Sequence, residues 1–214
     1  LEDVKPEQFL LLTFSKGAAL ELRQRIHAIV PEYRGLIKVT TFHGLCFELM
    51  GQLGDLDKSE TVIGRTIAAI GDNTVDISGL VNKSVILLDE FQDVDTEQWQ
   101  LIQLIAEKVE GPRIIAVGDD DQNIYAWRGA SPEFMAAFRE HFRARTHGLL
   151  TNYRSTPAIV DLAAHIADGI DNRIKAGQKL TAKSTAAGVL RAVEYAGGHP
   201  LQGLAEDLVT SAYP

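Results

Sequence analysis

This sequence of 214 residues lacks several features that would each assign it to a class of proteins. Its single cysteine, Cys46, excludes an internal disulfide framework and fits a reducing compartment. No apolar run approaches the length of a membrane span, and the first residues show no signal-peptide pattern. Internal repeats and low-complexity tracts are also lacking. We therefore expect a cytoplasmic protein that does not enter a membrane.

Positive charge is scarce as well. The formal net charge is −8, so the surface as a whole does not favour nucleic acid, and any nucleic-acid site has to be a local groove. An apolar content of 45% is enough for a proper core. The length predicts one medium domain or one and a half. The chain begins at Leu1, close to a predicted strand, which suggests a piece of a longer protein.

The stretch that organises the chain is an apolar strand followed by two acids. Residues 85–88 are apolar throughout, which is typical of a strand buried on both faces in a parallel sheet. Asp89 and Glu90 follow at the strand end, where open α/β sheets place their ligands. We hypothesise that Asp89 helps to hold Mg²⁺ and that Glu90 is a general base for water attacking a phosphoryl group. The alternative is a pair of solvated acids in a surface turn.

Two further strands are predicted before this one. Residues 9–14 precede Ser15, a plausible N-cap of a helix whose first N–H groups could bind a phosphate, although an ordinary turn is the simpler interpretation. Residues 36–41 precede a helix on which Phe42 falls in the apolar stripe. Core packing is therefore the plain interpretation of Phe42. His43 lies off the stripe, where it could meet a ligand or water.

A fourth strand, at residues 113–117, ends in three consecutive acids and Gln122. Adjacent acids are costly without a cation or strong donors nearby. The Gln122 amide could hydrogen-bond a terminal phosphate or its attacking water. The aromatic residues Tyr125 and Trp127 follow, next to an arginine, and such a cluster can stack on bases. Packing in the core is the alternative for Trp127.

The rest of the chain gives coarser predictions. The helix after residue 15 is expected to turn Ala18, Leu22, Ile26 and Ile29 toward the sheet, and a helix capped by Asp95 to bury Trp99. Residues 51–83 suggest a small insertion on top of the sheet around a short helix at 61–70. Residues 147–150 predict a short strand, 171–188 a loop, 189–195 a strand and 201–209 a helix. Between them, Arg154 suits a phosphate and Tyr153 could stack on a purine.

Five stretches, taken in order, carry a family resemblance. They are residues 13–19 (TFSKGAA), 41–44 (TFHG), 89–93 (DEFQD), 117–130 (VGDDDQNIYAWRGA) and 152–155 (NYRS). They resemble successive motifs of superfamily 1 helicases of the UvrD/Rep type, over roughly residues 9–165. The two acidic stretches, 89–93 and 117–130, are highly specific.

The resemblance implies a role for each matched position. Asp89 resembles the acid that coordinates Mg²⁺, with Glu90 beside it as the base that activates water. Gln122 resembles the residue that senses the γ-phosphate of ATP and links it to the DNA site. Tyr153 resembles the aromatic that stacks on adenine, and Arg154 an arginine that binds the γ-phosphate. The single-stranded DNA groove is implied at Phe42, His43, Tyr125 and Trp127, and a contact with the DNA backbone at Thr13 and Lys16.

The resemblance also implies a fold and a domain organisation. The fold class is α/β, a RecA-like P-loop NTPase with a parallel sheet flanked by helices. Residues 1–145 would form most of the first RecA-like motor domain, with a short insertion at about 51–83, and residues 146–214 the start of the second. The parent protein would be an ATP-dependent DNA helicase or translocase on single-stranded DNA, with DNA-repair or nuclease proteins as partners.

The sequence departs from the family pattern in three places. Lys16 and Gly17 stand where the early motif usually has Asn and Lys, and the segment between 50 and 84 is far shorter than the accessory domain usually inserted there. No Gly-Lys-Thr/Ser phosphate loop occurs in the chain, so we expect the isolated chain to have negligible ATPase activity. Two other hypotheses remain: a degenerate module that binds DNA or protein, and the motor subunit of a helicase–nuclease.

Overall fold

The computed structural model describes residues 4–51, 60–125, 129–131, 133–170, 173–174 and 177–188. The chain divides into two compact units, which are described separately. The first comprises Leu1–His147 and Asn172–Lys175, and the second Gly148–Asp171 and Ala176–Pro214. Over these described ranges, no helix is both long enough and apolar enough to cross a membrane.

The first unit is built on a four-stranded sheet in which every neighbouring pair is parallel. The strands lie in the order β2-β1-β3-β4. This arrangement confirms the predicted α/β class with a parallel sheet. The bounds are β1 (Phe9–Thr13), β2 (Lys38–Thr41), β3 (Val85–Leu88) and β4 (Arg113–Ala116).

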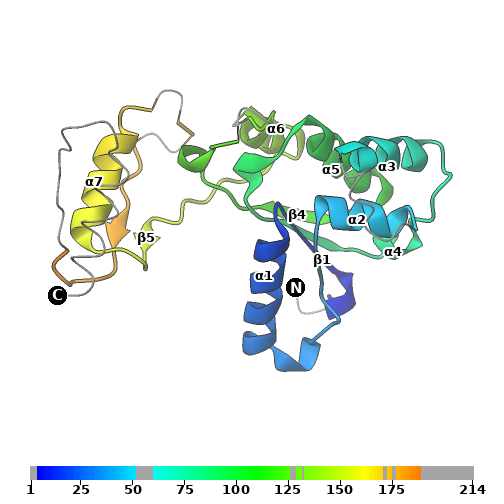
Figure 1. Ribbon diagram of the computed structural model, residues 1–214, viewed down its shortest axis with the longest axis horizontal. Helices are drawn as coiled ribbons and strands as arrows, with labels where there is room; N and C mark the ends of the chain where they lie inside the picture. Colours follow the sequence, from blue (N-terminus) through cyan, green and yellow to red (C-terminus); the bar gives the residue numbers. More distant parts are fainter. Residues whose placement is uncertain are drawn as a thin grey trace, which may run out of the picture. The chain divides into compact units, whose positions relative to one another are not determined.

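Helices cover both faces of this sheet, and α1 lies on the opposite side from α2, α3 and α5 (Figure 1). Two of the helix starts follow the predicted caps, because Ser15 Oγ accepts from the backbone N–H of Ala18 and Asp95 Oδ1 from that of Gln98. The helices are α1 (Lys16–Ile29), α2 (Phe42–Leu49), α3 (Val62–Gly71), α4 (Ser78–Val81), α5 (Thr96–Lys108) and α6 (Glu133–His141). Short 3₁₀ turns are η1 (Pro6–Gln8), η2 (Pro31–Tyr33), η4 (Phe91–Asp93) and η5 (Asp120–Gln122).

The core is divided unequally between the two faces. Because successive side chains of a strand point to opposite faces, Leu10 and Leu12 enter the large cluster, whereas Leu11 enters the small one. The large cluster combines residues of α2, α3, α5 and α6, and the small one depends on α1. At the far end of α1, Ile29 is 78% exposed and does not face the sheet as predicted. It is the last residue of a helix that is longer than the strands beneath it, so the final turn extends past the sheet.

Residues 62–71 form α3, close to the helix predicted at 61–70, and α3 contributes to the core on this side of the sheet. Val62, Ile63 and Ile70 are buried in the large cluster, and α3 packs against both α2 and α5. An apolar face on α3 is the physical reason, since it has to be buried against other elements. The segment also contains α4, which composition did not predict.

The order of the strands creates a switch point between β1 and β3. The chain leaves β1 through α1 on one face to reach β2, and leaves β3 through α5 on the other face to reach β4. Right-handed crossovers in opposite directions require opposite faces. The connections therefore diverge above the carboxyl ends of β1 and β3. In open α/β sheets this crevice is where ligands bind.

The second unit contains α7 (Pro157–Ala167) and a parallel pair of two-residue strands, β5 (Thr151–Asn152) and β6 (Thr181–Ala182). The strand predicted at 147–150 instead begins at Thr151, and the loop predicted at 171–188 contains β6. The N–H of Thr181 donates to the carbonyl of Leu150 over 2.8 Å, a pairing across about thirty residues that no local pattern specifies. The strand and helix predicted at 189–195 and 201–209 lie outside the described residues.

Candidate functional site

The carboxyl ends of β1, β3 and β4 are tied together by backbone hydrogen bonds just beyond the strands. The N–H of Asp89 donates to the carbonyl of Leu12 over 2.9 Å. The N–H of Phe91 donates to the carbonyl of Val117 over 2.9 Å, and that of Val117 to Leu88 over 2.8 Å. These bonds fix the acids after β3 against the loop after β4. Two stretches that sequence separates by almost thirty residues therefore form one site.

Glu90 has an unusual backbone conformation. Its φ of 52° and ψ of 45° lie in the left-handed region, which side chains other than glycine rarely adopt. Such a conformation costs about 1–3 kcal/mol and persists only where the surroundings impose it. It turns the chain sharply from the end of β3 into η4, and the Glu90 side chain is left exposed.

Gln92, in η4, connects Glu90 to the loop after β4. Its side chain is 2% exposed. The amide Nε2 donates to Glu90 Oε2 over 2.7 Å, and Oε1 accepts from the backbone N–H of Asp119 over 3.0 Å. The backbone carbonyl of Gln92 also accepts from Asn123 Nδ2 over 2.6 Å. Both ends of η5 are therefore attached to this one residue.

Asp119 extends the connection to Gln122. Asp119 Oδ2 accepts from Gln122 Nε2 over 2.7 Å, and Oδ1 accepts from the backbone N–H of Asp121 over 3.1 Å. A continuous set of hydrogen bonds thus runs from Glu90 through Gln92 and Asp119 to Gln122. Glu90 and Gln122 were predicted from the sequence as site residues. The residues that connect them, Gln92 and Asp119, were not.

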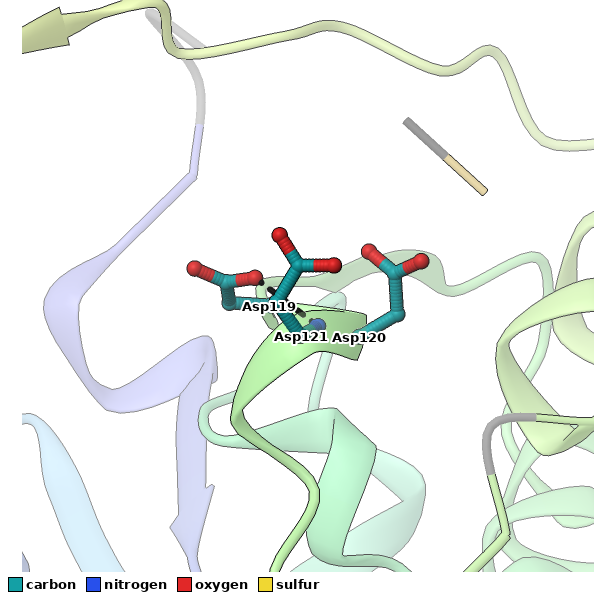
Figure 2. A group of neighbouring side chains, drawn as sticks. All are labelled: Asp119, Asp120 and Asp121. Carbon is teal, nitrogen blue, oxygen red and sulfur yellow. Dashed lines mark hydrogen bonds between the residues drawn. The ribbon is translucent and has the colours of Figure 1, made fainter. Parts of the chain in front are cut away.

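The three consecutive acids after β4 have protein donors. Figure 2 shows Asp119, Asp120 and Asp121 side by side, and one carboxylate oxygen of each lies within 4.8 Å of one oxygen of the other two. Arg173 donates to Asp121 through Nε and Nη2, each over 2.7 Å, and the two side chains are only 11% and 14% exposed. The backbone N–H of Ile174 donates to Asp120. A bidentate arginine and backbone donors thus offset the repulsion that the sequence predicts.

Negative charge is less well compensated at the end of β3. Burial, and then the neighbouring Glu90, raise the pKa of Asp89, and the same two causes raise the pKa of Asp93. None of the basic side chains that the structure describes pairs with Asp89. A half-buried carboxylate beside an exposed one offers oxygen ligands and excess negative charge. This donor set fits a hard divalent cation such as Mg²⁺.

The residues predicted to contact DNA differ widely in exposure. Thr13 and Phe42 are buried, Phe42 as part of the large core cluster. His43 is half-buried in the first turn of α2, and Lys16 is exposed in the first turn of α1. The DNA contacts of all four stay predictions.

Tyr125 is half-buried beside a residue that sequence reasoning did not single out. Its ring lies against that of Phe14, with centroids 5.0 Å apart and planes inclined at 31°. Phe14 follows β1 directly, so the stacked pair joins the end of β1 to the loop after β4. Trp127 lies outside the described residues.

Tyr153 and Arg154 belong to the second unit and are described within it alone. Asn152 Oδ1 accepts from the backbone N–H groups of Arg154 and Ser155, over 2.9 and 2.8 Å, and this turn leads from β5 into α7. The side chains of Tyr153 and Arg154 are exposed, Tyr153 by 78%. Together with Asn152 and Ser155 they line an open hollow of about 470 Å³. Their contacts with a nucleotide stay predictions.

The supporting residues missed by sequence reasoning are Gln92, Asp119 and Gly118. A Cβ on Gly118 would lie 2.8 Å from Gln92 Oε1 and 3.1 Å from the Gln92 backbone nitrogen. Glycine therefore permits the close approach of the two loops. Their signal in the sequence is position, because Gln92 and Gly118 each follow closely on a strand of the parallel sheet, at the edge where ligands bind.

A parallel sheet with helices on both faces and polar side chains at its switch point is typical of ligand-binding α/β proteins. The family model for the UvrD/REP helicase N-terminal domain matches residues 1–64 and 80–143. The chain belongs to the UvrD/Rep helicase family. The match is interrupted at 65–79, inside the segment that is short compared with the family pattern.

Two named helicases are similar in sequence to parts of this chain. DNA helicase II of Haemophilus influenzae is 42% identical over 89 residues, which are 42% of this chain and 12% of that protein. ATP-dependent DNA helicase PcrA of Staphylococcus epidermidis is 24% identical over 250 residues, covering 77% of this chain and 34% of that protein. The chain therefore spans only 12% and 34% of the length of these two relatives. The crystal structure of Pif1 helicase from Candida albicans, with 14% identity, a TM-score of 0.26 and coverage of 79% and 55% of the two chains, is too distant to bear on the fold.

Proposed function

We propose that the full-length protein carrying this chain is an ATP-dependent helicase or translocase on single-stranded DNA. In this proposal residues 1–145 supply most of the first RecA-like motor domain, and residues 146–214 the start of the second. Family membership and the names of the relatives support it. The observation that carries it is the hydrogen-bonded connection between Glu90 and Gln122 at the switch point of the sheet.

The chemistry proposed for the first unit is hydrolysis of the terminal phosphoryl group of ATP. Glu90 accepts the proton of the attacking water, and an exposed carboxylate held by Gln92 is suited to that role. The Gln122 amide hydrogen-bonds the γ-phosphate or the water. Asp89, with Glu90 beside it, would hold Mg²⁺, which when bound neutralises charge on the phosphates.

The second unit carries two residues that we propose contact the nucleotide. Tyr153 presents an exposed ring that can stack on adenine, and Arg154 presents a guanidinium that can form two parallel hydrogen bonds with a phosphate. Both follow β5 directly, and Asn152 fixes the turn that carries them.

Single-stranded DNA would bind across the loops that follow β1, β2 and β4. His43, Lys16 and the Phe14–Tyr125 stack lie at the surface or half-buried there, and Trp127 belongs to the same predicted groove. The buried Thr13 and Phe42 would act from beneath, by supporting these loops. Because the net charge is −8, this binding has to rely on stacking as well as on local basic groups.

The test is the ATPase activity of the full-length protein with and without single-stranded DNA, for the wild type, Glu90→Gln and Glu107→Gln. Glu107 is an exposed glutamate on α5 and serves as the matched control. We expect DNA-stimulated hydrolysis in the wild type and the control, and a loss of about 100-fold or more in kcat for Glu90→Gln. The KM for ATP should change little, because Gln keeps the side chain's shape. Undiminished hydrolysis by Glu90→Gln, or none by the wild type, would refute the proposal.

A further inference from the structure

Gln92 is a buried polar side chain in contact with both halves of the site. At 2% exposure it is as buried as the apolar core, yet it lies in a 3₁₀ turn rather than in a strand or long helix. Burying an amide is unfavourable unless its hydrogen bonds are made. Here they are made to Glu90 on one side and to Asp119 on the other. Such a position requires an explanation beyond packing.

We propose that Gln92 is a positioning residue for ATP hydrolysis, which holds the Glu90 carboxylate in a fixed relation to Gln122. This inference rests on the function proposed above and adds to it a residue that touches neither the nucleotide nor the reacting water. Its action is exerted through Glu90 directly and through Asp119 on Gln122.

The chemistry of the two hydrogen bonds specifies an amide at this position. The backbone N–H of Asp119 can only donate, so the atom facing it has to be the carbonyl oxygen of Gln92. The NH₂ group is then directed at Glu90, whose carboxylate can only accept when ionised. A carboxylate at position 92 would repel Glu90, and an apolar side chain would leave the Asp119 N–H without its partner.

The effect on Glu90 is one of orientation. Its Oε2 is held by Gln92 over 2.7 Å, which leaves Oε1 as the oxygen that takes the proton of water. The left-handed backbone at Glu90 is imposed by the same turn that carries Gln92. A general base works only when it lies within hydrogen-bond distance of the proton it removes. Loosening this carboxylate should therefore lower the rate of hydrolysis more than the affinity for ATP.

The effect on Gln122 passes through Asp119. The backbone N–H of Asp119 donates to Gln92, and the carboxylate of Asp119 accepts from Gln122 Nε2. Gly118 lets this loop approach, because a Cβ there would collide with Gln92 Oε1. If contact with phosphate displaces Gln122, these hydrogen bonds would consequently shift the Glu90 carboxylate as well.

The experiment compares three variants of the full-length protein: Gln92→Leu, Gln92→Glu and, as matched control, Gln98→Leu. Gln98 is also a glutamine with 2% exposure, but it lies on α5 and forms no part of these hydrogen bonds. For each variant we would measure DNA-stimulated kcat and KM for ATP between pH 6 and pH 8.5, the affinity for single-stranded DNA, and the urea midpoint. The urea midpoint reports loss of folding separately from loss of catalysis.

We expect Gln92→Leu to lower kcat about 10-fold or more at every pH, with KM and DNA affinity changed less than about 3-fold, and Gln98→Leu to keep the wild-type kcat. Gln92→Glu is nearly isosteric and keeps the volume of the side chain while it replaces the NH₂ donor by an oxygen. An ionised carboxylate at this position repels Glu90 instead of donating to it. Its kcat at pH 8.5 should therefore lie about 10-fold or more below that of the wild type.

Two results would overturn the inference. One is a Gln92→Leu protein with wild-type kcat, and the other is a Gln92→Glu protein with wild-type kcat at pH 8.5. Both are distinct from failure of the proposed function, in which the wild type itself shows no DNA-stimulated hydrolysis or Glu90→Gln stays active. If Gln92→Leu does not fold, the kcat of Gln92→Glu decides.

Discussion

Replacing Gly118 by alanine tests how tightly the loop after β4 is held against η4. A Cβ at this position would lie 2.8 Å from Gln92 Oε1, 3.1 Å from the Gln92 nitrogen and 3.2 Å from the Phe91 nitrogen. The side-chain oxygen could move, but the two nitrogens belong to the backbone, and that of Phe91 is itself bonded to Val117. Relief therefore requires the loop to withdraw. The φ of Gly118 is not in the left-handed region, so alanine meets no backbone strain of its own.

The expected cost follows from these contacts. Forcing one methyl group into a packed site typically costs about 1–3 kcal/mol, and losing the Gln92–Asp119 hydrogen bond adds about 1 kcal/mol. Alanine also restricts the unfolded chain, which stabilises by about 0.4–1 kcal/mol. The net prediction is a destabilisation of about 1–3 kcal/mol. Gly79→Ala in α4 is the control, because a Cβ there has nothing within 4 Å and only the favourable effect remains.

Urea unfolding followed by tryptophan fluorescence measures this difference. A Trp127→Phe background leaves Trp99 as the sole tryptophan, and Trp99 packs edge-on to Phe91 with ring centroids 6.3 Å apart. The probe therefore reports on the region where the clash would occur. With slopes of about 1–3 kcal/mol per molar urea, the Gly118→Ala midpoint should fall by about 0.5–2 M. A midpoint for Gly118→Ala that equals or exceeds that of Gly79→Ala would refute the reasoning.

Three further predictions concern charge and activity. In a double-mutant cycle with Arg173→Ala and Asp121→Asn, the largely buried pair should show a coupling of about 1–3 kcal/mol in urea unfolding, against less than about 0.5 kcal/mol for the exposed Arg25–Glu21 pair; equal couplings would contradict it. Asp89→Asn should raise the urea midpoint at pH 7 while abolishing hydrolysis in the full-length protein. The raised pKa of the Asp89 carboxyl means that its charged form is disfavoured in the folded state. The wild type therefore gains stability as the pH falls toward 3.8, the pKa of this carboxyl in the unfolded chain. The stability advantage of Asp89→Asn should shrink over the same range. The isolated chain, without a Gly-Lys-Thr/Ser sequence, should hydrolyse ATP at background rate in a phosphate-release assay, and robust DNA-stimulated hydrolysis would contradict this.

The strands β1 and β3 could be predicted because burial on both faces leaves a mark in local composition. An apolar run such as 85–88 requires no knowledge of its neighbours, and a cap such as Ser15 acts within three residues. The placement of Asp89 and Glu90 at a strand end was predictable for the same reason. Their neighbours in space follow from topology, which a strand pattern alone does not specify.

The parts of the site that could not be predicted depend on pairs distant in sequence. The Gln92–Asp119 bond joins residues 27 apart, and the Arg173–Asp121 pair joins residues 52 apart. No local period or propensity records such contacts. The conformation of Glu90 was hidden for a related reason, because a left-handed glutamate contradicts its own preference and exists only where the surrounding fold requires it.

The left-handed backbone of Glu90 has a consequence for laboratory evolution of this chain. Glycine or asparagine would adopt φ near 52° at lower cost, which relieves about 1–3 kcal/mol of backbone strain against about 1 kcal/mol for the lost hydrogen bond from Gln92. Substitutions at position 90 are therefore among the simplest ways to raise thermal stability. Either one removes the carboxylate. A library selected for heat resistance alone would therefore be enriched in proteins that have lost Glu90. For any variant with raised thermal stability, residue 90 should therefore be sequenced before the variant is assumed to be active.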